Sequence, residues 1–127
     1  MIVDSSAIVA IVVREPGHDA LVEKLAAGGA GIGAPTLVEL GLVLTARLQR
    51  DSRPVLDGLL ERLDLDVVAF GDAHWRAAVG AHVRFGRGRH RAGLNFGDCL
   101  TYAVASLADE PLLFVGDDFT HTDLRAA

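Results

Sequence analysis

A single aspartate separates a short apolar segment from a long apolar run at the start of this chain. Residues 1–3 have the composition of a buried strand, Asp4 follows directly, and an almost unbroken apolar run occupies residues 7–13. An ionised carboxylate that is buried without a partner costs several kcal/mol. Whatever fold the chain adopts must therefore offset the charge of Asp4 at the seam between a strand and a helix.

The rest of the chain alternates between strand-like and helix-like segments. Strands are expected at residues 1–3, within the glycine-rich stretch 28–34, at 66–70 and at 112–115. Helices are expected from Ser5 or Ser6 to about Val13, and then over 18–27, 35–50, 54–63, 73–83 and 95–107. This alternation predicts the α/β class, with a parallel sheet covered by helices on both faces.

Size and composition indicate one domain over residues 1–127, with half the residues hydrophobic. The single cysteine, Cys99, cannot form an internal disulfide and does not suggest a zinc site. A formal net charge of −5 disfavours a protein that coats nucleic acid through bulk charge. The acidic start and the early interruption at Arg14 and Glu15 disfavour a signal peptide or membrane span, so a cytoplasmic protein is expected.

Acidic residues occur where apolar ones are expected. Asp4 ends the first strand, Asp117 and Asp118 follow the last, and Glu39 and Asp98 stand inside apolar helices. Each has a simpler explanation as a cap or a solvated side chain. No cation is reserved to balance them as a group, because the chain contains one lysine. Two carboxylates about 4 Å apart repel by roughly 4 kcal/mol. Oxygen ligands of this kind suit Mg²⁺ or Mn²⁺, which would support hydrolysis of a phosphodiester.

Four segments resemble, in order and spacing, the motifs of PIN-domain ribonucleases of the VapC toxin type. They are MIVDSSAIVAIVVRE, APTLVEL, LNFGDCLTYAVA and LLFVGDDF, and they span nearly the whole chain. The resemblance implies a PIN-like three-layer α/β/α sandwich with a central parallel sheet. It also implies a Mg²⁺- or Mn²⁺-dependent endoribonuclease, the toxin of a toxin–antitoxin pair, with a cognate VapB-type antitoxin.

The resemblance also assigns site residues. Asp4, Asp98 and Asp117 match metal ligands, and Glu39 matches the acid that would orient or deprotonate the attacking water. The adjacent aspartates of the GDD segment leave the register open, so Asp118 remains the second choice for the fourth acid.

Supporting residues follow from the same match. Ser6 matches a small hydroxyl that supports the metal site, and Asn95 matches a polar residue at the mouth of the cleft. Thr101, one turn after Asp98, is either a further support or an ordinary surface threonine.

A basic stretch between residues 84 and 91 is the candidate RNA-backbone site, because arginine forms forked hydrogen bonds with phosphate. A solvated loop without a ligand is an equally good interpretation. The candidate RNA-binding residues are Arg84, Arg87, Arg89 and Arg91.

Other apolar residues are open to more than one interpretation. Phe96, Tyr102 and Trp75 are expected in the core, although Phe96 and Tyr102 could stack on bases. The apolar excess over residues 37–48 is either core or a partner surface, for a second copy in a homodimer or for an antitoxin helix.

Two other functions compete with the nuclease. A receiver-like phosphoacceptor domain has a similar length and an acidic magnesium pocket, but it needs a lysine after a late strand, and Lys24 lies near the start. A catalytically silent PIN-like module that binds RNA or protein is the third hypothesis.

Overall fold

The protein contains a four-stranded parallel sheet at its centre. The computed structural model describes all residues 1–127, and its strands are β1 (Ile2–Val3), β2 (Ala30–Gly33), β3 (Leu65–Val68) and β4 (Leu112–Leu113). Their order across the sheet is β3-β2-β1-β4. Ile2 pairs with Gly31 on one side and with Leu112 on the other, so β1 lies at the middle of the sheet.

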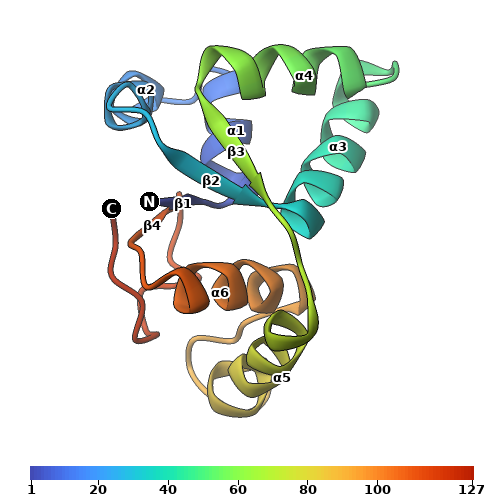
Figure 1. Cartoon of the computed structure of the whole chain (residues 1–127). Helices are drawn as coiled ribbons and strands as arrows, with labels where there is room; N and C mark the ends of the chain where they lie inside the picture. Colours follow the sequence, from blue (N-terminus) through green and yellow to red (C-terminus); the bar gives the residue numbers. More distant parts are fainter.

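Six helices complete a three-layer α/β/α architecture (Figure 1), which confirms the predicted fold class. Helices α5 and α6 lie on one side of the sheet, and the other helices lie on the opposite side or at its edge. The helices are α1 (Ser5–Val12), α2 (His18–Leu25), α3 (Ala34–Leu48), α4 (Arg53–Arg62), α5 (Asp72–Phe85) and α6 (Phe96–Ala108).

Two hydrophobic cores lie on the two faces of the sheet. Ile2 and Leu112 point into the core formed with α5 and α6. Val3, Ile32 and Leu113 point into the core formed with α1, α3 and α4. Because neighbouring residues of a strand face opposite ways, even the two-residue strand β1 contributes to both cores.

The carboxyl ends of the strands are closely packed by helices. Strand β2 leads directly into α3, and Gly33 at this junction lies against α6, since a Cβ there would be 2.9 Å from Val104 Cγ2. The close packing of α6 on β2 therefore requires glycine, and it brings α3 and α6 to the same edge as the end of β1.

Some sequence expectations are wrong in detail. Helix α5 continues to Phe85, so Arg84 belongs to its last turn and not to a loop. Phe96 and Trp75, expected in the core, are 81% and 47% exposed, whereas Tyr102 is buried as predicted. Strand β4 ends at Leu113, two residues earlier than expected, because the chain after it leaves the sheet. No helix has both the length and the apolar character needed to cross a bilayer.

Candidate active site at the carboxyl edge of the sheet

Asp4 lies at the junction of β1 and α1 and is only 7% exposed. Its Oδ2 accepts hydrogen bonds from the Ser6 backbone N–H at 3.0 Å and from Ser6 Oγ at 2.6 Å. Its Oδ1 accepts a hydrogen bond from Thr101 Oγ1 at 2.8 Å. These bonds offset much of the cost of burying the charge, and the first of them makes Asp4 the N-cap of α1.

Thr101 connects Asp4 to the helices on both sides of the sheet. Its hydroxyl lies 3.1 Å from Thr36 Oγ1 of α3, and both threonines are buried. Thr101 is therefore a support of Asp4 and not a surface threonine. Ser6 also accepts a hydrogen bond from the Val115 N–H, so the first strand and the segment after the last are joined through one serine.

Glu39 extends from α3 toward the start of α6 and is exposed to solvent. Ser5 Oγ donates a hydrogen bond to Glu39 Oε1 at 2.8 Å. On its other side the carboxylate lies against Gly97, where a Cβ would overlap Glu39 Oε2. The position of Glu39 therefore depends on a hydroxyl at the first turn of α1 and on the missing side chain at residue 97.

Asp98 forms a reciprocal pair of hydrogen bonds with Asn95 at the start of α6. The Asp98 N–H donates to Asn95 Oδ1 at 2.9 Å, and the Asn95 N–H donates to Asp98 Oδ2 at 3.0 Å. This capping box fixes the first turn of the helix. The backbone N–H of Asn95 thus orients the Asp98 carboxylate, while the Asn95 side chain accepts from the Asp98 N–H.

The electrostatic environment of Asp98 connects it to the other acids. Burial raises the pKa of Asp98 from 3.8 to about 6, against the opposing hydrogen bond from the Asn95 N–H. The negative charges of Asp118, Asp4 and Glu39 raise this pKa further. The fold therefore brings three acids from distant parts of the sequence close to Asp98, which makes a group of four.

The fourth member of this group is Asp118. Both GDD aspartates are exposed, but only Asp118 has a charge that shifts the pKa of Asp98. Gly116 has a φ of +98°, which turns the chain sharply before the two aspartates. The charge of Asp118 acts on Asp98, and we therefore use Asp118 as the fourth acid in place of Asp117, the first choice from the sequence.

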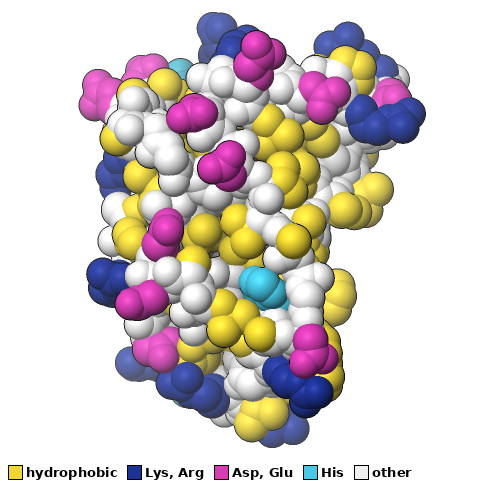
Figure 2. Space-filling view, viewed as in Figure 1, with side chains coloured by type: hydrophobic (Ala, Val, Ile, Leu, Met, Phe, Trp, Pro, Cys, Tyr) yellow, Lys and Arg dark blue, Asp and Glu magenta, His cyan; other side chains and the backbone are white.

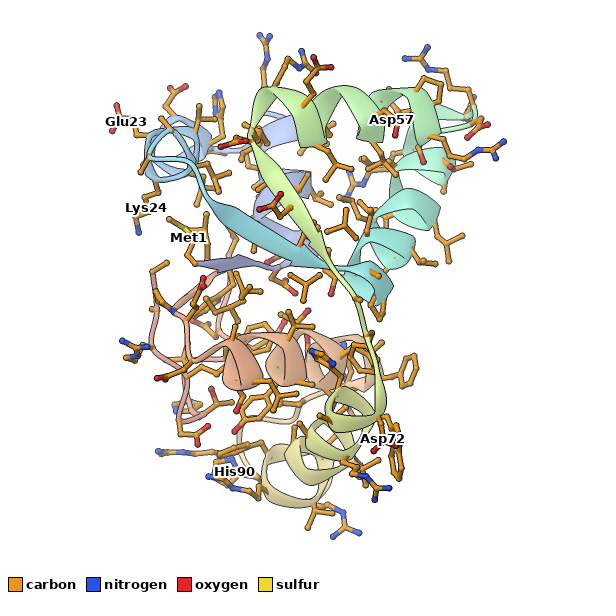
Figure 3. All side chains as sticks on the ribbon, viewed as in Figure 1. Met1, Glu23, Lys24, Asp57, Asp72 and His90 are labelled. Atoms are coloured by element: carbon orange, nitrogen blue, oxygen red, sulfur yellow. The ribbon has the colours of Figure 1, made fainter.

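None of these acids has a cationic partner within the protein. The ion pairs of the protein involve other carboxylates. The only lysine, Lys24, donates to the Ala127 carbonyl oxygen at 2.7 Å on the side where the strands begin (Figure 3). An all-carboxylate set with unbalanced charge fits a hard divalent cation. The side chains do not form a preformed cage, because no three acidic, histidine or cysteine residues are placed to hold an ion as they lie.

Arg84 is engaged in an internal contact. Its Nη2 donates to Asp123 Oδ2 at 3.2 Å, and Tyr102 OH donates to the other oxygen of this carboxylate at 2.7 Å. Residues from α5, α6 and the C-terminal segment are thereby joined. Arg84 therefore has an internal partner, which the sequence did not indicate.

The remaining arginines lie on the loop between α5 and α6. Helix α5 starts near the carboxyl edge of the sheet and is about 20 Å long, and Phe85 at its end accepts a hydrogen bond from the Leu94 N–H. In Figure 3, His90 lies beyond the end of α5, far from Asp72 at its start. Arg87, Arg89 and Arg91 are exposed without ion pairs, and the loop returns to the site through Leu94 and Asn95. His90 packs its ring on Phe85, which gives it a structural role away from the acids.

Sequence reasoning missed two residues of this site. Ser5 was considered only as a cap, and Gly97 was not considered. Both are adjacent to recognised residues, but their contacts with Glu39 involve residues more than thirty positions away in the sequence. Ser5 could have been suspected as a second hydroxyl beside Asp4, whereas nothing in the local pattern marks Gly97.

Comparison with known proteins agrees with this geometry. The model of the PIN domain matches residues 1–124. Ribonuclease VapC36 of Mycobacterium tuberculosis is 48% identical over 127 residues, which cover 98% of this chain and 91% of that protein. Ribonuclease VapC42 of the same species is 44% identical over 129 residues, covering 100% and 98%.

Solved structures share the fold at low sequence identity. M. tuberculosis VapC20, described as a sarcin–ricin loop cleaving toxin, superposes with a TM-score of 0.76 at 16% identity, covering 99% of this chain and 97% of that one. A toxin–antitoxin complex from Klebsiella pneumoniae gives 0.69 at 14% identity, with 96% and 92% covered. The chain belongs to the PIN-domain family and is a relative of the VapC ribonucleases. The receiver-like alternative is therefore wrong.

Proposed function

We propose that this protein is a Mg²⁺- or Mn²⁺-dependent endoribonuclease that acts as the toxin of a toxin–antitoxin pair. One observation carries the proposal. Three acids, one at the start of α1, one on α3 and one in the segment after β4, act on Asp98 of α6, and no cation balances the four charges. A chain related to VapC ribonucleases has a direct use for such a site, because a bound divalent cation would compensate the charge.

Asp4, Asp98 and Asp118 are the residues that would hold the metal. When bound, the ion would supply an activated water and neutralise charge on the scissile phosphate. Ser6 and Thr101 keep Asp4 in one orientation, and the backbone N–H of Asn95 does the same for the Asp98 carboxylate. Fixed carboxylates reduce the reorganisation that is needed when substrate binds.

Glu39 is the acid we assign to the attacking water. Unlike Asp4, it is exposed, and it accepts only the hydrogen bond from Ser5. One carboxylate oxygen therefore remains available to accept a proton from water or to orient it.

Cleavage of a fluorescent single-stranded RNA oligomer with Mg²⁺ or Mn²⁺ tests the proposal. We expect Asp4→Asn and Asp98→Asn to reduce the rate at least about 100-fold, while both variants fold. The matched control is Asp57→Asn, because Asp57 is an exposed acid on α4, on the far side of the sheet from α5 and α6 (Figure 3). Wild-type rates in both site variants would reject the assignment. An inactive wild-type protein that binds RNA would favour the silent module.

The partners follow from the relatives and from the exposed apolar residues of α3. Figure 2 shows hydrophobic side chains on the surface between the upper helices and the α5–α6 layer. Val38 and Leu42 are 63% and 70% exposed on α3. We assign the α3 surface around Val38 and Leu42 to the interface of a homodimer. This homodimer acts in the cytoplasm and is held inactive by a VapB-type antitoxin. Light scattering tests the dimer, which Val38→Asp with Leu42→Asp should convert to monomers.

A further inference from the structure

A groove lies between α5 and α6, and it shares Phe96 and Leu100 with the groove that contains Glu39. Its volume is about 520 Å³. Asn95, whose N–H donates to the Asp98 carboxylate, lines the groove together with Arg87 of the α5–α6 loop. Its walls come from α5, the α5–α6 loop and the start of α6.

Phe96 stands where this groove meets the acidic site. It is the first residue of α6, and its side chain is 81% exposed, more than any other large hydrophobic residue of the chain. The same ring also lines the adjoining groove, together with Glu39 and with Val38 and Leu42 of the proposed dimer surface, and the test below separates the two uses. An aromatic face left in water at this position offers apolar surface to a ligand that occupies the site.

The charges of the groove differ from those of the acidic site. No carboxylate lines it, whereas Arg87 and His82 do, together with the Asn95 amide. Val79, Leu94 and Leu100 supply apolar walls. A ligand that matches this lining has a flat apolar body and a negatively charged group, which is the chemistry of a nucleotide.

We propose that the α5–α6 groove is a subsite for one nucleotide of the RNA next to the scissile bond. The base stacks on Phe96, and Arg87 contacts a phosphate. The proposal rests on the ribonuclease function proposed above and extends it, because it gives the path by which the strand leaves the acidic site toward the α5–α6 loop.

The test measures RNA binding without cleavage. A fluorescein-labelled single-stranded RNA of mixed sequence is titrated in EDTA with the full-length protein carrying Phe96→Ala, Phe96→Leu or Phe96→Trp. Stacking on one base predicts about tenfold or greater weakening for alanine and for leucine, and near-wild-type affinity for tryptophan. Val83→Ala is the matched control, because Val83 is 56% exposed on α5 but does not line the groove.

Further measurements make the result specific. Arg87→Ala should reduce the salt dependence of binding by the equivalent of one phosphate contact, and replacing single nucleotides of the RNA by abasic sites should reproduce the Phe96→Ala effect at one position. Equal affinity of the Phe96→Leu variant and of the wild type for the RNA would overturn the stacking role. So would Phe96→Ala protein that is monomeric by light scattering but binds RNA normally, which would assign the groove to a second copy. If the wild type neither binds nor cleaves RNA, the proposed function itself fails.

Discussion

Gly97 has no side chain, and its value to this site comes from that absence. The Glu39 carboxylate occupies the space that a Cβ at residue 97 would take. Alanine is favoured over glycine within a helix by about 1 kcal/mol, so a glycine at this position is not explained by the helix alone. Gly97 and Ser5 together set where Glu39 lies.

Gly97→Ala should therefore separate stability from activity. We expect RNA cleavage to fall at least tenfold while the melting temperature stays the same or rises, since Glu39 must move and the helix gains a better residue. Gly80→Ala in α5 is the control, because a Cβ there meets nothing within 4 Å. Equal cleavage by both variants would show that Glu39 does not need its position beside Gly97.

Asp98 allows a prediction about pH. Its pKa is raised from 3.8 to about 6 in the folded protein, so the folded state binds more protons than the unfolded state between these values. The stability of the metal-free protein should therefore fall as pH rises from 4 to 6. The full shift corresponds to about 3 kcal/mol, and solvent screening reduces the expectation to about 1–2 kcal/mol.

Comparing Asp98→Asn with the wild type isolates this contribution. Asparagine can still accept the Asn95 N–H hydrogen bond of the capping box, so the cap is retained. In urea titrations in EDTA, the variant should gain stability relative to the wild type as pH rises from 4 to 6. A stability difference between the two proteins that stays constant with pH would mean that burial and the acidic neighbours do not raise the pKa of Asp98.

At the scale of elements, the arrangement of strands and helices was predictable and the roles of several side chains were not. Apolar periodicity fixes where α6 lies, but Thr101 could be assigned to Asp4 only once the fold placed α6 beneath β1. Arg84 belongs to a basic stretch, yet it pairs with Asp123, 39 residues later. Phe96 has the residue type of a core position, but at the first turn of α6 its side chain points outward.

The α5–α6 loop allows a prediction about charge. Replacing Arg87, Arg89 and Arg91 together by alanine should weaken RNA binding and lower the slope of log affinity against log salt by about 2, because each phosphate contact contributes about 0.7. Arg84→Ala should leave this slope unchanged, since its guanidinium is paired with Asp123. An identical salt dependence in the triple variant would make the loop a solvated segment without a role in binding.

At the scale of the whole molecule, the site is a place where folding brings like charges together. Asp4 directly follows β1 as the N-cap of α1, and the helices on the two faces of the sheet bring Glu39 and Asp98 to the same edge. The metal-free fold bears this repulsion, so any ligand that removes it should stabilise the folded state over the unfolded one. Stability and metal binding are therefore linked through the same carboxylates.

Metal titration of unfolding tests this linkage in full. Mn²⁺ at a hundredfold excess over its dissociation constant should stabilise the wild type by about 2.7 kcal/mol, and EDTA should reverse the effect. Asp98→Asn should be more stable than the wild type without metal and gain less from Mn²⁺, because the variant has already lost the charge that the ion compensates. Asp57→Asn should respond like the wild type, since its carboxylate lies on α4 away from the site. Equal stabilisation of all three proteins would place the bound metal elsewhere on the surface, and the carboxylates around Asp98 would then need another explanation.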